Sequence, residues 1–331
     1  MIRMTSLGGI NEHGRNCFCL KGSKTLLLDC GEGEKGEEPD FEKTDIKKID
    51  YLFLSHCHID HTGSIQRLLE RGFHGTICLS KATLSYLKLT YPKIQILMPN
   101  EEIRFSEGLR VSSTRSGHCF GSLSLHIRLD GKKILYTGDY LEESVFSCDR
   151  IRKEEADLAI IDAAYDDAEK SYSENKKSFL DFINGKTDIL LPLPKNGRSM
   201  DVISFLNEER IPYHLLDSFF MEEKGMYLKK DIPIRDDGTA KVRLFSDPQI
   251  KKKENLEYIS QHPESCLIFT GTLDSGSMAE KLLKERKNTF FFRINVHQRI
   301  QDAKRLEEEN TFRNVILFHN RNTKEKTEIL L

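Results

Sequence analysis

The chain has 331 residues, a length that fits one large domain or two moderate ones and suffices for a sizeable buried core. Its 50 lysines and arginines against 52 aspartates and glutamates give a net charge of −2, which excludes a strongly basic, sequence-independent nucleic-acid coat but not a local basic groove. No apolar run approaches the roughly 18 residues of a membrane span, and the N-terminal segment lacks the apolar core of a secretory signal.

Short β-rich runs alternate with helical patterns along the chain, as expected of α/β layers. Strands are predicted at Thr25–Leu28, Tyr51–Leu54, Thr76–Leu79, Ile134–Thr137, Leu158–Ile161, Ile189–Leu191, Leu267–Phe269 and Val315–Phe318. Helices are predicted at Ser64–Arg71, Lys81–Tyr91, Ser173–Ile183, Met200–Glu209, Met278–Arg286 and Gln301–Glu309. The polar stretch Lys229–Glu257 is expected to be a solvated loop or lid.

The eight cysteines form no CxxC pair and stand mostly within or beside apolar runs. In a chain of this length such cysteines are not a disulfide framework. We therefore expect reduced thiols in a cytoplasmic protein.

Five of the predicted strands are followed closely by a residue of a type that binds metals. These residues are Asp29, His56, Asp139, Asp162 and His319. A single aspartate after a strand is often only a turn former or a helix cap. Because strand ends lie at the rim of a sheet, where sites collect in α/β layers, the five segments together predict one shared site.

The segment 55–64 reads Ser-His-Cys-His-Ile-Asp-His-Thr-Gly-Ser and carries the densest cluster of potential ligands. Imidazole nitrogens and carboxylate oxygens are the usual ligands of catalytic zinc. Alternate residues of an extended segment point the same way, so His56 and His58 can hold one ion. Asp60 and His61 follow where the chain turns into the next helix and can face a second ion. A surface histidine cluster is the structural alternative.

Two further ligands are predicted downstream. His118 lies between glycines in Ser116–Ser122, which allow the backbone a close approach to a metal. Asp139 follows a strand, and a carboxylate there can bridge two cations.

These motifs resemble those of the metallo-β-lactamase-fold hydrolases of the β-CASP nuclease branch, which includes ribonuclease J-like and cleavage-factor-like enzymes. Asp29, the segment His56–His61, His118 and Asp139 match the first four motifs of that branch. Its later motifs A, B and C match Asp162, His297 and His319, although His319-Asn320-Arg321 replaces the usual His-Gly-Glu.

The resemblance implies an α/β fold, a four-layer αββα metallo-β-lactamase sandwich with an inserted β-CASP-like α/β cap domain. Residues 1–165 and 296–331 would form the metallo-β-lactamase domain, and residues 166–295 would form the cap.

The resemblance also implies two Zn²⁺ ions, with Mn²⁺ as the alternative metal. Their expected ligands are His56, His58, Asp60, His61, His118, Asp139 and His319. The expected catalytic residues are Asp60, His297, Asp29 and Asp162, of which Asp29 would orient a ligand and Asp162 would hold the tautomer of His297. His297 would stabilise phosphate or protonate the leaving oxygen. Lys195 and Arg198 either contact substrate phosphate or are solvated loop charges.

The expected function is two-zinc-dependent hydrolysis of a phosphodiester by a metal-bridging hydroxide, with RNA or another single-stranded nucleic acid as the substrate. A metallo-hydrolase of a small phosphodiester or ester is one alternative. A non-catalytic scaffold is another, which the complete ligand set disfavours. No membrane partner is expected, and a homodimer stays open.

Overall fold

The computed structural model describes residues 1–143, 148–167, 170–184, 189–193, 202, 205–206, 209–211, 213–215, 266–270, 288–289 and 296–331. The chain forms two compact units, one made of residues 1–169 with 296–331 and the other of residues 170–295. The candidate ligands predicted above all belong to the first unit.

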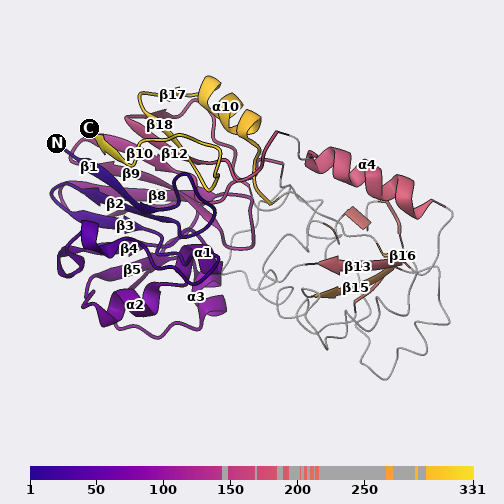
Figure 1. Ribbon diagram of the computed structural model, residues 1–331, viewed down its shortest axis with the longest axis horizontal. Helices are drawn as coiled ribbons and strands as arrows, with labels where there is room; N and C mark the ends of the chain where they lie inside the picture. The colour runs from indigo at the N-terminus through magenta and orange to yellow at the C-terminus, as the bar shows by residue number, and fades with distance from the viewer. Residues whose placement is uncertain are drawn as a thin grey trace. The chain divides into compact units, whose positions relative to one another are not determined.

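The first sheet contains β1 (Arg3–Gly8), β2 (Cys17–Lys21), β3 (Thr25–Leu28), β4 (Tyr51–Phe53), β5 (Thr76–Leu79), β6 (Ile94–Ile96) and β19 (Glu328–Leu330). Its order is β19-β1-β2-β3-β4-β5-β6 (Figure 1). The strands from β19 to β3 pair antiparallel, whereas β3, β4, β5 and β6 are parallel. Parallel neighbours need crossover connections. These contain the 3₁₀ turns η1 (Phe41–Lys43) and η2 (Ile46–Lys48) and the helices α1 (Ile59–Thr62), α2 (Ile65–Glu70) and α3 (Lys81–Leu87).

The second sheet contains β7 (Glu102–Arg104), β8 (Leu109–Arg115), β9 (Leu123–Leu129), β10 (Lys132–Tyr136), β12 (Leu158–Asp162) and β18 (Val315–Phe318), in the order β18-β12-β10-β9-β8-β7. The four strands from β7 to β10 form an antiparallel meander, and β10, β12 and β18 are parallel. A short ladder joins β11 (Glu155–Ala156) to β17 (Thr311–Phe312), and α10 (Ile300–Glu308) precedes β17.

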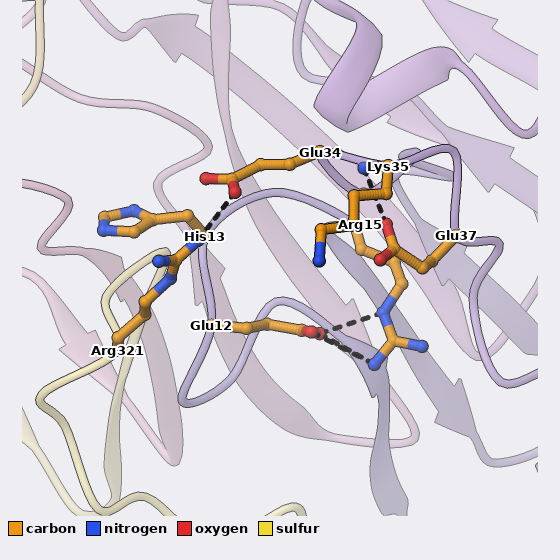
Figure 2. A pocket seen from close by; sticks show the side chains of 8 residues that line it. Glu12, His13, Arg15, Glu34, Lys35, Glu37 and Arg321 are labelled. Carbon is orange, nitrogen blue, oxygen red and sulfur yellow. Dashed lines mark hydrogen bonds and ion pairs between the residues drawn. The ribbon is translucent and has the colours of Figure 1, made fainter.

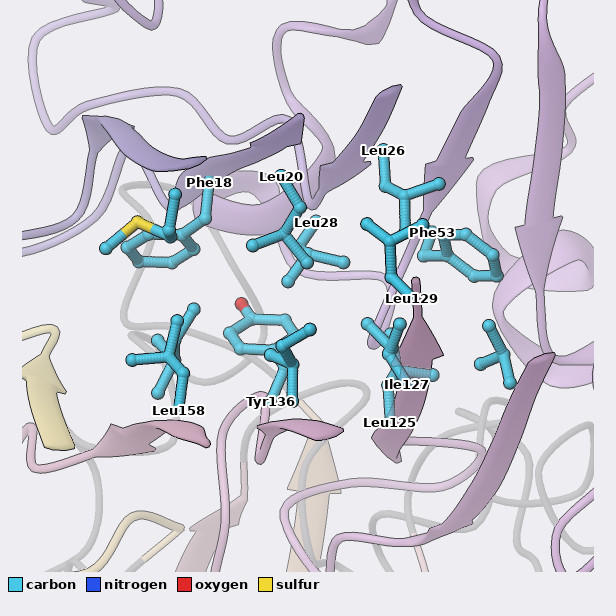
Figure 3. Packing of buried hydrophobic residues seen from close by; sticks show 14 of the residues in the cluster. Phe18, Leu20, Leu26, Leu28, Phe53, Leu125, Ile127, Leu129, Tyr136 and Leu158 are labelled. Carbon is cyan, nitrogen blue, oxygen red and sulfur yellow. The ribbon is translucent and has the colours of Figure 1, made fainter. Parts of the chain in front are cut away.

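The main hydrophobic core lies between the two sheets (Figure 3). Phe18 and Leu28 of the first sheet face Leu125, Tyr136 and Leu158 of the second, and each of these side chains is fully buried. Full burial of one such side chain contributes about 1.5–3 kcal/mol. This core holds the two sheets against each other.

Smaller cores cover the outer face of each sheet. On the first sheet, Leu27 and Leu52 pack in one cluster with Ile65 and Leu68 of α2. On the second sheet, Leu135 and Ile161 pack with Ala303 and Leu306 of α10. Alternate residues of a strand point to opposite faces, so strands covered on both sides read as continuous apolar runs. The helix–sheet–sheet–helix layering confirms the predicted αββα sandwich.

The second unit contains a parallel sheet in the order β14-β15-β13-β16. Its strands are β13 (Ile189–Leu193), β14 (Tyr213–Leu215), β15 (Cys266–Thr270) and β16 (Asn288–Thr289), and helix α4 spans Tyr172–Ile183. Ser171 and Glu174 form a capping box at the start of α4. Lys195, Arg198 and the predicted helix Met278–Arg286 lie outside the described residues. Within the described part of the chain, no helix has the length and apolarity to cross a bilayer.

Candidate metal centre

Most of the candidate ligands gather at the carboxyl ends of parallel strands from both sheets, and His118 follows β8 of the antiparallel meander. From the first sheet come Asp29 after β3 and the segment 55–61 after β4; from the second come Asp139 after β10, Asp162 at the end of β12 and His319 after β18. The carboxyl ends of parallel strands lie at one edge of a sheet, so the two sheets together surround a single site.

Two of these residues adopt left-handed backbone conformations. Asp29 has φ 58° and His319 has φ 68°. The backbone N–H of Asp29 donates to the carbonyl oxygen of Phe53 at 2.8 Å, and that of His319 donates to the carbonyl oxygen of Gly9 at 2.8 Å. Such conformations are uncommon for residues other than glycine and concentrate at functional sites.

The first donor set consists of His56, His58, His118 and Asp139, whose ligand atoms all lie within 4.8 Å of one another. The Nδ1 atom of His58 lies 3.0 Å from His56 Nε2 and 2.8 Å from His118 Nε2. Asp139 Oδ2 is 3.4 Å from His56 Nε2 and 3.3 Å from His118 Nε2. Tetrahedral ligands about 2.05 Å from zinc stand about 3.3 Å apart, so these distances fit one cation.

The second donor set consists of Asp60, His61, Asp139 and His319. His61 Nε2 lies 3.0 Å from Asp139 Oδ1 and 3.5 Å from Asp60 Oδ2. His319 Nε2 lies 3.2 Å from Asp60 Oδ2. Asp139 therefore turns one oxygen to each donor set.

Two buried polar atoms of the second set support a cation there. Asp139 Oδ1 and His319 Nδ1 have no hydrogen-bond partner among the described residues, although they lie 3.3 Å apart. A buried polar atom without a partner costs free energy that coordination of a metal would recover. The residues present fit a divalent ion.

Hydrogen bonds on the outer side of two histidines fix their tautomers. His118 Nδ1 donates to the carbonyl oxygen of Val296 at 2.7 Å, and His61 Nδ1 lies 2.6 Å from Asp29 Oδ2. Carbonyl and carboxylate oxygens only accept, so each ring carries a proton on Nδ1 and directs Nε2 to the centre.

The electrostatics of the first set favour neutral rings. Burial and the nearby His61 ring hold the pKa of His56 well below its ordinary value. Burial likewise lowers the pKa of His118. Neutral imidazole is the form that binds a metal.

The second set instead attracts positive charge. Burial alone would lower the pKa of His61, but the carboxylates of Asp139 and Asp60 raise it well above its ordinary value. The same carboxylates, acting against burial, raise the pKa of His319 to about 10. Burial would raise the pKa of Asp139, yet the surrounding imidazoles, His61 first, hold it well below its usual value.

His297 and Asp162 lie beside these sets. His297 Nδ1 is 3.1 Å from Asp162 Oδ2 and 3.6 Å from Asp139 Oδ2. Asp162 is fully buried and accepts the backbone N–H groups of Tyr140 and Ala164 at 3.0 and 3.1 Å. The side chain of His297 is 12% exposed, so this ring is the one the pair presents toward solvent.

Three residues at the centre were not predicted as site residues. Ser55 donates its backbone N–H and its hydroxyl to Asp29, each at 2.7 Å, and the Tyr136 hydroxyl donates to Asp29 Oδ2. Asn16 Nδ2 lies 2.9 Å from His61 Nε2 and 3.4 Å from Asp60 Oδ2. Ser55 carries a sequence signal, because it begins the histidine motif, and Asn16 lies in the segment Gly14–Cys17, which resembles the start of the family's sequence.

Asn320 and Arg321, which follow His319 in place of the usual Gly-Glu, each make their own contacts in the structure. Asn320 is buried and its Nδ2 donates to the carbonyl oxygen of Ala163 at 2.8 Å and to Asp166 Oδ1 at 3.3 Å. These bonds tie the segment after β18 to the segment after β12. The side chain of Arg321 instead forms an ion pair with Glu34 at 2.7 Å.

A charged cavity of about 510 Å³ adjoins the centre (Figure 2). Its lining residues are Glu12, His13, Arg15, Gly33, Glu34, Lys35, Glu37 and Arg321. The His13 ring lies 5.8 Å from the His319 ring, centroid to centroid. Arg15 pairs with Glu12 and Arg321 pairs with Glu34, so the positive charges lining the cavity are largely balanced.

Comparison with known proteins identifies the family to which this chain belongs. The family model described as the metallo-beta-lactamase superfamily matches residues 10–194, more than half of the chain. The chain belongs to the metallo-β-lactamase superfamily. A solved structure of a protein of unknown function from Enterococcus faecalis V583 shares the fold over 100% of both chains, with a TM-score of 0.70 and 12% identity.

Two curated relatives define the branch. The chain is 24% identical to an RNase J-like protein of Methanocaldococcus jannaschii over 87% of this chain and 76% of that protein. It is 25% identical to Endoribonuclease YSH1 of Kluyveromyces lactis over 62% of this chain, but this match spans only 33% of the yeast protein. These matches confirm the predicted resemblance to the β-CASP branch of the metallo-β-lactamase superfamily.

Proposed function

We propose that this chain is a two-zinc-dependent phosphodiester hydrolase that cleaves RNA. The observation that carries the proposal is the convergence of two donor sets that share one carboxylate. Their members are His56, His58, His118, Asp60, His61, His319 and the shared Asp139. The names of the relatives, an RNase J-like protein and an endoribonuclease, support RNA as the substrate.

The chain's own residues would hold the ions as follows. His56, His58 and His118 with Asp139 Oδ2 would hold one, and the second donor set with Asp139 Oδ1 would hold the other. Nitrogen and carboxylate donors suit zinc, with Mn²⁺ as the alternative. Divalent cations bound there supply Lewis-acid polarisation of a phosphoryl oxygen and acidify water toward hydroxide at neutral pH.

The remaining residues would position and move protons. Asp29 keeps the Nδ1 proton on His61, so that Nε2 remains a ligand. Asp162 holds Nδ1 of His297, which leaves His297 Nε2 to donate a proton to the leaving oxygen of the cleaved strand.

The proposal extends to the second unit. We assign residues 166–295 to a β-CASP-like cap, in which Lys195 and Arg198 contact substrate phosphates. A homodimer is compatible with this assignment.

The test is cleavage of end-labelled RNA, single-stranded DNA and bis(p-nitrophenyl) phosphate by the zinc- or manganese-loaded chain. RNA should be cut, and His58→Ala should lower the rate by at least the roughly 100-fold that loss of an outer metal-site partner can cost. His126→Ala is the matched control, because His126 contacts Thr114 and Glu154 instead of the centre. Equal cleavage by wild type and His58→Ala would refute the proposal. Cleavage of the small diester alone would mean that the substrate is a small phosphodiester and not RNA.

A further inference from the structure

Two thiols lie beside the histidines of the first donor set. Cys57 stands between His56 and His58 in the sequence, and Cys119 directly follows His118. One ring nitrogen of His58 and the Sγ atoms of Cys57 and Cys119 all lie within 4.8 Å of one another. Both cysteines are thiols, not halves of a disulfide.

Local hydrogen bonds hold the backbone of both thiols in place. Thr62 Oγ1 donates to the carbonyl oxygen of Cys57 at 3.2 Å. Ser122 Oγ donates to the carbonyl oxygen of Cys119 at 2.8 Å and accepts its N–H at 3.1 Å. Cys57 is 9% exposed and Cys119 is 1% exposed, so both thiols are confined to the interior. These hydrogen bonds and the burial therefore hold the two thiols in fixed positions.

We propose that Cys57, Cys119 and His58 form a binding site for a single thiophilic cation such as Cu⁺, Zn²⁺ or Cd²⁺. Thiolate sulfur is a soft donor that these ions prefer, and imidazole nitrogen also suits zinc and copper, whereas Mg²⁺ and Mn²⁺ prefer oxygen. Two thiolates about 2.3 Å from a tetrahedral zinc stand about 3.8 Å apart, which is compatible with ligand atoms that all lie within 4.8 Å of one another. Three protein donors leave one position of such an ion open.

The thiol site competes with the first donor set, because both use His58. In the first set, His58 Nδ1 faces His56 Nε2 at 3.0 Å and His118 Nε2 at 2.8 Å. A cation held by the two sulfurs and this same ring nitrogen would deprive the first set of one of its ligands. Soft metals thus gain a route to inhibit the centre, and this inference does not depend on the nature of its substrate.

The experiment titrates the metal-free full chain with Cd²⁺ and follows the ultraviolet charge-transfer absorbance that arises only when thiolate binds the metal. Wild type should show a band whose final intensity corresponds to one thiolate-bound Cd²⁺ per chain, and Cys57→Ala and Cys119→Ala should each lose most of it. Cys19→Ala is the matched control, a buried thiol of β2 next to Thr44, and should keep the band. A band that survives in both site variants, or no band in wild type, would overturn the proposal.

A second measurement needs no substitution. Cadmium-113 NMR of the wild-type chain should show one resonance at the downfield shift of sulfur coordination, distinct from the resonances of nitrogen and oxygen sites. Only nitrogen- and oxygen-type resonances would contradict the thiol site. Neither readout requires RNA cleavage, so the outcome is separate from that of the nuclease proposal.

Discussion

Asp29 links the candidate metal centre to both sheets of the sandwich. It follows β3 of the first sheet and accepts hydrogen bonds from Ser55, while its Oδ2 atom lies 2.6 Å from His61 Nδ1. The Tyr136 hydroxyl reaches the same oxygen from β10 of the second sheet, across the main core. A buried carboxylate needs several donors, and here they come from both layers.

Tyr136→Phe should therefore weaken metal binding without removing any ligand. The lost hydroxyl leaves Asp29 less firmly oriented, and loss of such an outer partner typically costs 10–100-fold in metal affinity, as an order of magnitude. Zinc affinity measured by chelator competition checks this. Tyr51→Phe is the matched control, because Tyr51 is a partly buried tyrosine of β4 that packs on Phe105. Equal zinc affinity in both variants would show that the Tyr136 hydroxyl does not support metal binding through Asp29.

Among single residues, the sequence predicts the candidate ligands better than it predicts the residues that orient those ligands. The segment His56–His61 is recognisable because several ligand types crowd into one short stretch. His297 stands out only through the family resemblance. His319 is also marked by its place directly after a predicted strand, but that position becomes informative only together with the four other strand ends. Tyr136 carries no signal, because a tyrosine inside an apolar strand is indistinguishable from a core residue.

At the centre, Gly31 allows two neighbouring segments of backbone to approach each other closely. A Cβ atom on Gly31 would lie 1.7 Å from the carbonyl oxygen of Asp60. The segment after β3 thus packs backbone to backbone against the helix that carries Asp60 and His61.

Gly31→Ala should consequently push Asp60 and His61 out of position. We expect a loss of about 1–3 kcal/mol of stability together with weakened zinc binding. Gly131→Ala is the matched control: its Cβ would meet nothing within 4 Å, so a strained φ of 80° should cost stability alone. Chemical denaturation and zinc titration separate the two effects, and unaltered zinc affinity in Gly31→Ala would contradict this account.

The loop that carries His118 is anchored by an ion pair. Asp149 accepts the backbone N–H of Arg115 at 3.0 Å and two guanidinium nitrogens at 2.9 and 2.8 Å. Burial opposes ionisation of Asp149, but these bonds from Arg115 hold its pKa below the ordinary value.

Asp149→Asn should destabilise the chain by about 1.5–3 kcal/mol at neutral pH. A carboxyl whose pKa is lowered in the folded state stabilises the fold above its unfolded pKa of about 3.9 and loses that contribution as the pH falls through the folded value. Denaturation at a series of pH values should show wild type and variant converging below about pH 4. A difference independent of pH would mean that the charge is not responsible.

Several continuous apolar strands were predicted with the right bounds, but β2, which reads Cys-Phe-Cys-Leu-Lys, and the half-polar strands β8 and β9 were not predicted. β3, β5 and β18 have the predicted bounds. β8 and β9 were missed, because their polar and apolar residues alternate, as in Leu109–Arg115, and the strong signal used was an unbroken apolar run. β12 continues to Asp162, so that aspartate is the last residue of its strand and not the residue after it.

For the molecule as a whole, a metal in this centre should act as a clamp between the sheets. Ligand binding to the folded state stabilises it by about 2.7 kcal/mol when the free ligand is 100 times its Kd. Zinc should therefore raise the Tm of chelator-treated protein, and Asp139→Asn, which affects both donor sets, should remove most of that increase.

His126→Ala supplies the control for the clamp. It should keep the increase in Tm on addition of zinc, because His126 contacts Thr114 and Glu154 and lies outside both donor sets. An equal zinc-induced increase in the Asp139→Asn protein would show that the stabilising metal binds elsewhere.

His319 contributes to the second donor set from β18, far along the chain from Asp60 and His61. During synthesis on the ribosome, the centre therefore cannot be completed until that strand has emerged and inserted beside β12. A partly made chain has its early histidines but lacks the late one. Any phosphodiester-cleaving activity would then be withheld from the translation machinery, which itself contains RNA, until the strand that carries His319 has emerged and folded.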